Sequence, residues 1–160
     1  MLARAITVAS ANEWPAERQC ATVTLDYDGR HRRRIRLTTD EGEPFLLDLP
    51  QAVRLGEGDG LALEDGGYVR VVAAEEPVAD LSCRELSKTA RVAWHIGNRH
   101  IPIQVLADGA LRIRDDHVIV EMARQLGAQV HRHQAPFSPE PGAYASRGDG
   151  HHGQGHAHEH

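Results

Sequence analysis

The hydrophobic periodicity of this 160-residue chain changes at Glu75-Glu76-Pro77. Before this break, short apolar runs separated by turn signals are typical of a small all-β domain. After it, runs with the two-residue period of a strand alternate with runs that have the 3.6-residue period of a helix. The sequence therefore predicts two domains of different architecture, at residues 1–75 and 76–144, followed by a tail at residues 145–160.

Five strands are expected in the first domain, which favours a small barrel or sandwich. The pairs Asp28-Gly29 and Gly66-Gly67 are turn signals at two of the connections. The strands are expected at residues 21–27, 34–38, 45–49, 61–63 and 68–72. None of these runs carries a pattern that indicates catalysis.

The second domain is expected to begin with a strand at residues 78–81 and a helix. Ser82 and Glu85 have the spacing of a capping box, in which a hydroxyl and a carboxylate each bond to a free backbone amide. Gly97 can adopt the left-handed conformation that ends a helix. The apolar side of this helix is predicted from residues at helical spacing: Leu86, Ala90, Ala93 and Trp94.

A hairpin and a second helix are expected next. Asp108-Gly109 predicts a type I′ turn between strands at 101–105 and 111–113. Asp115 or Asp116 can cap the helix that follows, and Gly127 can end it. The apolar face of this helix is formed by Ile119, Met122, Ala123 and Leu126.

With a last strand at residues 129–134, the order of elements is that of the ferredoxin-like βαββαβ fold. The expected fold class is therefore α+β, with a small N-terminal all-β domain, a ferredoxin-like domain and a disordered tail.

Composition excludes several classes of function. A formal charge of −5 and only seven aromatic residues argue against nucleic acid, and the basic run 30–34 is interpreted as a solvated strand face. No apolar run is long enough for a membrane span or a secretory signal, so a cytoplasmic protein is expected. Cys20 and Cys83 are interpreted as small buried hydrophobes. Because HExxH, GxSxG and Gly-rich phosphate motifs are absent, an enzyme is not expected.

The last ten residues, HHGQGHAHEH, hold five of the eleven histidines. Neutral imidazole is a ligand that Ni²⁺, Cu²⁺ and Zn²⁺ favour, which predicts a metal-binding tail. The interrupted spacing differs from the unbroken run of a purification tag. Many glycines and prolines with few aliphatic side chains favour disorder when metal is absent. The candidate ligands are His151, His152, His156, His158 and His160.

The second domain adds further candidate ligands. His95 and His100 flank the exit of the first helix in the segment HIGNRH, and His117 lies in the first turn of the second helix. The positive helix terminus there favours a neutral ring, which can donate to a metal. His131 and His133 share one face of a strand, but they are interpreted as structural histidines.

Several segments in the same order resemble the urease accessory nickel metallochaperones, the UreE family. They are HIGNRH (95–100), DDHVIVEMARQLGAQV (115–130), APFSPEPGAY (135–144) and the histidine-rich end. LDYDGRHRRRIRLTTDEGEPFLLDLP in the first domain agrees with them. The resemblance spans nearly the whole chain.

The resemblance implies a carrier that delivers Ni²⁺ to the urease activation complex, although Zn²⁺ or Cu²⁺ can also bind. Its implied partners are a second copy, joined through the C-terminal domains, the urease accessory GTPase and the urease apoprotein. The N-terminal domain is expected to contact a partner protein. His100 would meet its twin across the dimer and share one metal, with tail histidines completing the shell. His117 would provide a second position, where Asp115 stands in place of a histidine that some members carry.

Two other functions remain open at this point. A histidine-rich metal buffer or storage protein would also need the tail, but it would not require a separate β-domain. A peptide-binding chaperone module would use the β-domain, and its activity would survive loss of the tail and of His100.

Overall fold

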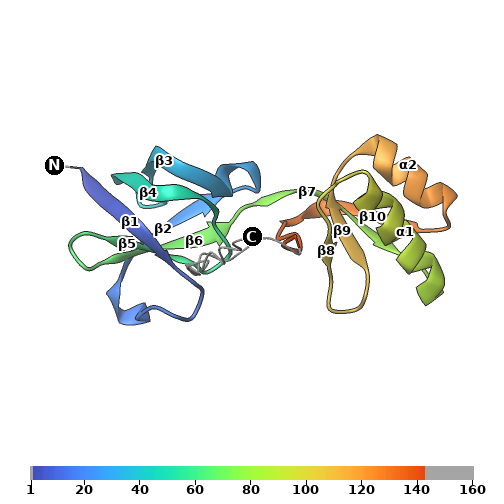
Figure 1. The fold of residues 1–160 in the computed structure, drawn as a ribbon, viewed down its shortest axis with the longest axis horizontal. Helices are drawn as coiled ribbons and strands as arrows, with labels where there is room; N and C mark the ends of the chain where they lie inside the picture. Colours follow the sequence, from blue (N-terminus) through green and yellow to red (C-terminus); the bar gives the residue numbers. More distant parts are fainter. Residues whose placement is uncertain (1, 143–160) are drawn as a thin grey trace, which may run out of the picture.

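The N-terminal domain is a single mixed sheet of six strands in the order β2-β6-β5-β1-β4-β3. The computed structural model describes residues 2–142. The β1–β4 and β2–β6 pairs are parallel and the other pairs are antiparallel (Figure 1). The strands are β1 (Ala3–Ala9), β2 (Gln19–Leu25), β3 (His31–Thr38), β4 (Pro44–Arg54), β5 (Gly60–Leu63) and β6 (Tyr68–Ala73), with short 3-10 turns at η1 (Ala16–Arg18) and η2 (Asp28–Arg30).

All five strands expected in this domain are present, but β1 was not predicted. Only Ala5 of β1 is buried, so the strand has no apolar alternation that a sequence pattern could reveal. It forms because β4 and β5 bond to its two sides. The sheet curls, and Asp40 in the turn after β3 accepts hydrogen bonds from Thr24 on the edge strand β2.

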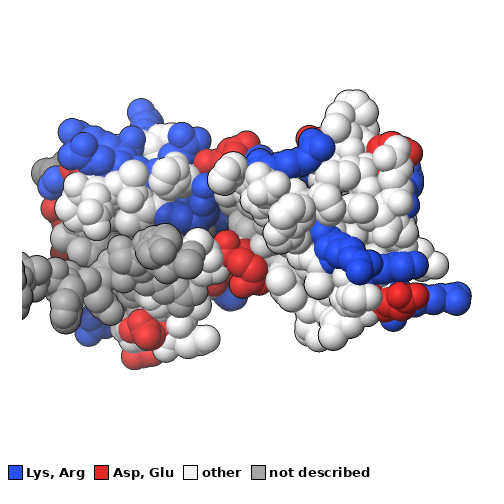
Figure 2. All heavy atoms as spheres, turned by 45° about the vertical axis from the view of Figure 1, so that its right-hand side comes forward, with Lys and Arg blue, Asp and Glu red and all other residues white. Residues whose placement is uncertain are grey.

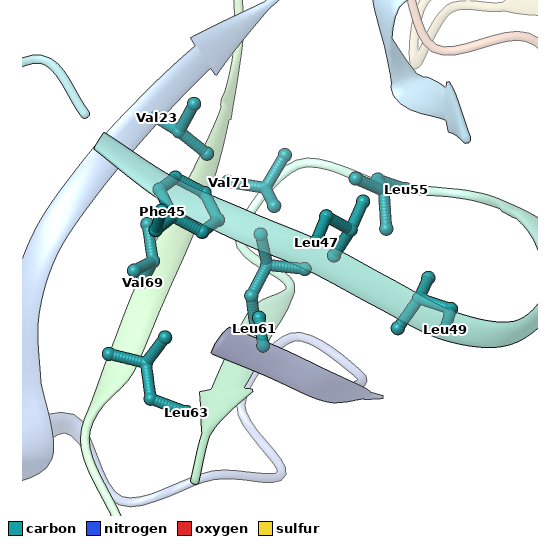
Figure 3. Close-up of a cluster of buried hydrophobic side chains, with 10 residues drawn as sticks. Val23, Phe45, Leu47, Leu49, Leu55, Leu61, Leu63, Val69 and Val71 are labelled. Carbon is teal, nitrogen blue, oxygen red and sulfur yellow. The ribbon is translucent and has the colours of Figure 1, made fainter. Parts of the chain in front are cut away.

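The core of this domain lies inside the curled sheet (Figure 3). Alternate residues of β4 point inward, because successive side chains of a strand face opposite sides. The buried residues are Ala5, Val23, Phe45, Leu47, Leu49, Leu55, Leu61, Leu63, Val69 and Val71. This apolar interior holds no group suited to chemistry, so the functional side chains lie elsewhere.

The C-terminal domain has the expected ferredoxin-like topology. Its sheet has the order β10-β7-β9-β8 with every pair antiparallel, and two helices pack on one face (Figure 1). The elements are β7 (Glu75–Ser82), α1 (Leu86–Asn98), β8 (Gln104–Val105), β9 (Leu111–Arg114), α2 (His117–Gln125) and β10 (Gln129–Pro136). The α+β fold class is therefore confirmed. Neither helix is long and apolar enough to cross a membrane.

The second helix follows the prediction closely. The Asp116 carboxylate accepts hydrogen bonds from the backbone amides of Val118 and Ile119, as an N-cap should. Gly127 has a φ of 96°, and Ala128 N–H donates to the carbonyl of Ala123. The predicted apolar face of α2 packs against the sheet.

The first helix differs from the prediction at its start and on its apolar face. Ser82 belongs to β7, and Glu85 is an N-cap that makes no side-chain hydrogen bond, so the capping box is absent. Val92 and Ile96 are the buried residues of α1. Leu86, Ala90 and Trp94 face solvent, and only Ala93 of the predicted stripe packs against the core. The helix carries two apolar stripes, and periodicity alone does not decide which one the sheet covers.

Two smaller predictions also were wrong. Gly109 has a positive φ but Asp108 does not, so the β8–β9 turn is a three-residue loop with one left-handed glycine and not type I′. Cys20 is exposed and is therefore not a buried hydrophobe, whereas Cys83 is half-buried and packs against the core of the second domain.

The two sheets meet at a junction around Tyr27. Its ring packs against Phe137, with the ring centroids 5.3 Å apart. The guanidinium groups of Arg54 and Arg114 lie 3.9 and 4.7 Å from the centroid of the Tyr27 ring. Its backbone N–H donates to the Glu76 carboxylate at 2.9 Å. Residues from both domains thus surround one aromatic side chain.

Arg30, expected on a solvated face, is 1% exposed. Its guanidinium donates to the carbonyls of Leu25 and Phe137, and Nε has no partner among the described residues. Burial lowers the pKa of this side chain. Arg32 to Arg34 are exposed as predicted, and Figure 2 shows basic side chains gathered along one edge of this domain.

Candidate metal site at the end of the first helix

His100 terminates α1 with a backbone conformation that is uncommon for any residue but glycine. Its φ is 59°, in the left-handed region. His100 N–H donates to the carbonyl of Gly97 at 3.0 Å, and Ile101 N–H donates to that of Ile96 at 3.4 Å. These two bonds form a Schellman motif, in which glycine usually occupies the position of His100. The helix therefore ends beyond Gly97, contrary to prediction, and Gly97 does not have a positive φ.

This geometry presents an imidazole from a fixed backbone. Ile96 and Ile101 are anchored in the core of the domain, while His100 itself is exposed. A left-handed residue other than glycine costs of order 1 kcal/mol, and such residues cluster at functional sites. His100 is thus a solvent-accessible potential ligand held in place by folded structure.

His95 lies one turn earlier on α1 and is half-buried. Its ring meets the Trp94 ring edge-on, with centroids 5.0 Å apart. Within residues 2–142 no three His, Cys, Asp or Glu side chains lie close enough together to hold a metal ion. Within one chain, the described residues therefore do not provide further ligands that could bind a metal together with His100.

Asp115 and His117 lie at the start of α2 and are exposed. The Asp115 carboxylate forms an ion pair with Arg132, with Nε and Oδ1 3.0 Å apart. A metal at Asp115 would compete with this arginine for the negative charge of the carboxylate. The arrangement around His117 therefore fits a metal less well than that around His100.

The five tail histidines, His151, His152, His156, His158 and His160, lie outside the described residues. The last described segment is held against the strand that follows His100. Glu140 N–H donates to the Ile103 carbonyl at 2.7 Å, and Val105 N–H donates to the Glu140 carboxylate at 3.1 Å. The last described residues therefore lie beside Ile103 and Val105, which follow His100 closely in the sequence.

A polar network on the C-terminal sheet was missed by the sequence analysis. Asp80 accepts two hydrogen bonds from Arg112, at 2.7 and 3.0 Å, and lies 2.7 Å from Nε2 of His133. Burial alone would raise the pKa of Asp80, but the bonds from Arg112 and His133 outweigh it and hold that pKa below its usual range. Strand alternation could have placed Asp80 and Arg112 on one face, but their pairing depends on register.

Comparison with known proteins supports the assignment suggested by these motifs. The family model for the UreE urease accessory protein, C-terminal domain, matches residues 76–160, and the N-terminal domain model matches residues 3–74. The chain belongs to the UreE family. The resemblance inferred from the sequence is therefore confirmed, and the UreE family is one of accessory proteins, not of enzymes.

Individual UreE relatives agree over most of the chain. It is 51% identical to the urease accessory protein UreE of Rhodopseudomonas palustris (strain BisB18), over 89% of this chain and 66% of that protein. The relative from Beijerinckia indica is 45% identical over 93% of this chain and 85% of its own length. The Rhodobacter capsulatus relative is 44% identical over 99% of this chain and 98% of its own length. The chain spans just under two thirds of the first relative and nearly all of the last.

Proposed function

We propose that this chain is a nickel carrier that binds Ni²⁺ at His100 and delivers it during urease maturation. The observation that carries the proposal is the exposed His100 imidazole in the left-handed helix-terminating position. The relatives are named urease accessory proteins, which supports urease as the destination. Zn²⁺ and Cu²⁺ are alternative cargo, because imidazole sites follow the Irving–Williams order.

The partner at His100 is proposed to be a second copy of the chain. Leu86, Ala90 and Trp94 form an exposed apolar stripe along α1, the helix that ends at His100. Leu86 is 85% exposed and Trp94 is 64% exposed. Figure 2 also shows wide uncharged areas on the visible side of this domain. Exposed apolar surface of this kind indicates an interface. A two-fold axis near the end of α1 would cover the stripe and bring two His100 rings to one metal.

The tail is proposed to complete the coordination shell. At about 3.3 Å per residue, the chain from Glu140 to His151 can extend over roughly 35 Å. The hydrogen bond from Glu140 to Ile103 starts this span near His100. Tail histidines are therefore within covalent reach of the proposed site. The accessory GTPase and the urease apoprotein are the proposed recipients, with the N-terminal domain as their contact surface.

Replacing all five tail histidines with asparagine in the full-length chain should lower the number of Ni²⁺ ions bound per dimer but leave at least one tight site. The physical reason is that His100 is held by the folded domain while the tail only adds ligands. Titration calorimetry of both proteins measures the stoichiometry. Equal stoichiometry would contradict a role for the tail, and complete loss of binding would contradict the site at His100.

Trp94→Lys should weaken dimerisation at least tenfold, because a buried tryptophan is a common interface anchor and a charge there is unpaired. Sedimentation velocity over a range of protein concentrations measures the effect. Ile6→Lys is the control, because Ile6 is an exposed apolar residue on β1 of the other domain. An unchanged dimer in Trp94→Lys would contradict the proposed α1 interface.

A further inference from the structure

The face of the C-terminal sheet opposite its helices carries the polar network around Asp80. Ala79, Leu81 and Ile113 point toward the helices and are buried. Because side chains alternate, the residues between them point to the other face. In the register of the sheet, Asp80 stands opposite Arg112 on β9 and opposite His131 on β10.

Two histidines lie side by side on this face. The rings of His131 and His133 are stacked, with centroids 4.6 Å apart and an angle of 29° between the planes. Their strand, β10, is at the edge of the sheet. His131 is exposed, and the side chain of His133 is 30% exposed. An ion can therefore reach both rings from solvent.

Asp80 fixes one ring in a state suited to metal binding. Its carboxylate is held by Arg112 and, being ionised, can only accept hydrogen bonds. Nε2 of His133, 2.7 Å away, must therefore carry the proton. In a neutral ring this leaves the lone pair on Nδ1 as a ligand. A carboxylate bonded to the second nitrogen is the usual outer-shell partner of a metal-binding histidine.

We propose that His131 and His133 form a second, chelating site for a borderline divalent cation such as Ni²⁺, Cu²⁺ or Zn²⁺. His133 is the fixed ligand, oriented by Asp80. His131 is the movable ligand, which turns from its stacked position to share the ion. Two imidazoles from positions two apart on a strand provide adjacent coordination positions.

The site is open, with the remaining positions filled by water or by an incoming donor. The described residues provide no third His, Cys, Asp or Glu close enough to close the shell. An open site exchanges its ion more readily than a closed structural one. A purely structural role explains the bond between His133 and Asp80, but it does not explain an exposed second imidazole stacked on the first.

The experiment uses the full-length chain with His100 and the five tail histidines replaced by asparagine. Cu²⁺ and Ni²⁺ are titrated into it and followed by calorimetry, with visible and electron paramagnetic resonance spectra for Cu²⁺. One ion per chain with nitrogen ligation is expected. Because His100 is absent, this result stands whether or not the proposed carrier function holds.

Further variants in this background identify the ligands. Either His131→Asn or His133→Gln should weaken binding at least tenfold, and Asp80→Asn should weaken it about 10- to 100-fold. His31→Asn, on an exposed strand of the other domain, is the matched control that should change nothing. Circular dichroism checks the fold of each variant. The substitution of His131 should leave the fold unchanged, because this residue is exposed. Absence of binding in the background protein, or binding that persists without His131, would overturn the proposal.

Discussion

Replacing His100 with glycine should abolish the tight shared nickel site and at the same time stabilise the fold by about 0.5 to 1 kcal/mol. Glycine adopts the left-handed conformation without the steric cost that a Cβ atom imposes. The φ of 59° at this position therefore favours glycine over histidine. Denaturant unfolding of the metal-free protein, with the protein concentration held constant, measures the free energy of unfolding. Calorimetry measures Ni²⁺ binding.

His100→Ala is the matched variant, because it removes the same imidazole but retains the unfavourable backbone. Both variants should lose the site, and the glycine variant should be more stable than the alanine variant by about 1 kcal/mol. His31→Ala, in the β-domain, should bind Ni²⁺ as the unmodified chain does. Tight binding of one ion per dimer by either His100 variant would sink the assignment. A glycine variant less stable than the alanine variant would contradict the backbone argument.

The sequence predicted those elements whose signals are local. Asp116 caps the start of α2 and Gly127 follows its end, as predicted, because a cap needs only neighbouring backbone amides and carbonyls. Strand β1 was missed because its pairing with β4 and β5 is long-range and only Ala5 is buried. The ferredoxin-like order of strands and helices could be inferred from the order in which the two-residue and 3.6-residue hydrophobic periods follow one another along the chain.

The candidate site was predicted in part for the same reason. The spacing in HIGNRH drew attention to His95 and His100, but it did not reveal that His100 is the left-handed residue. Gly97 is able to end a helix, yet the left-handed residue that ends α1 lies three positions later, at His100. Ile101, which follows it, packs against the core. The ion pair of Asp115 with Arg132 depends on how β10 lies beside the start of α2.

Burial of charged residues was the least predictable feature. Arg30 looks like its exposed neighbours in sequence, but it is buried, and its guanidinium donates to the nearby Leu25 carbonyl and to the Phe137 carbonyl, which is far away in sequence. The Asp80 network likewise joins residues from β7, β9 and β10. Such groups are identified only when the strand register is known.

Phe137→Ala should lower the free energy of unfolding by about 3 to 5 kcal/mol, the range for a fully buried phenylalanine. Phe137 is 0% exposed and packs with Val78, Ala135 and Tyr27 at the junction of the two domains. Its backbone carbonyl, which accepts from Arg30, is retained in the variant, so the change isolates the ring. Denaturant unfolding measures the loss. Phe45→Ala, in the N-terminal core, should cause a comparable loss.

Phe137→Ala and Phe45→Ala should differ in how much the relative position of the two domains varies. Spin labels on Cys20 in the first domain and Cys83 in the second report the distance between the domains. Removing the Phe137 ring leaves the Tyr27 ring without its aromatic neighbour. The polar contacts between the domains remain: Arg114 with the Tyr27 ring and with Asp28, Glu76 with the Tyr27 amide, and Arg30 with the carbonyl of residue 137. The distance distribution should broaden in folded Phe137→Ala and stay narrow in folded Phe45→Ala. Equal distributions would mean that the polar contacts alone set the arrangement of the two domains.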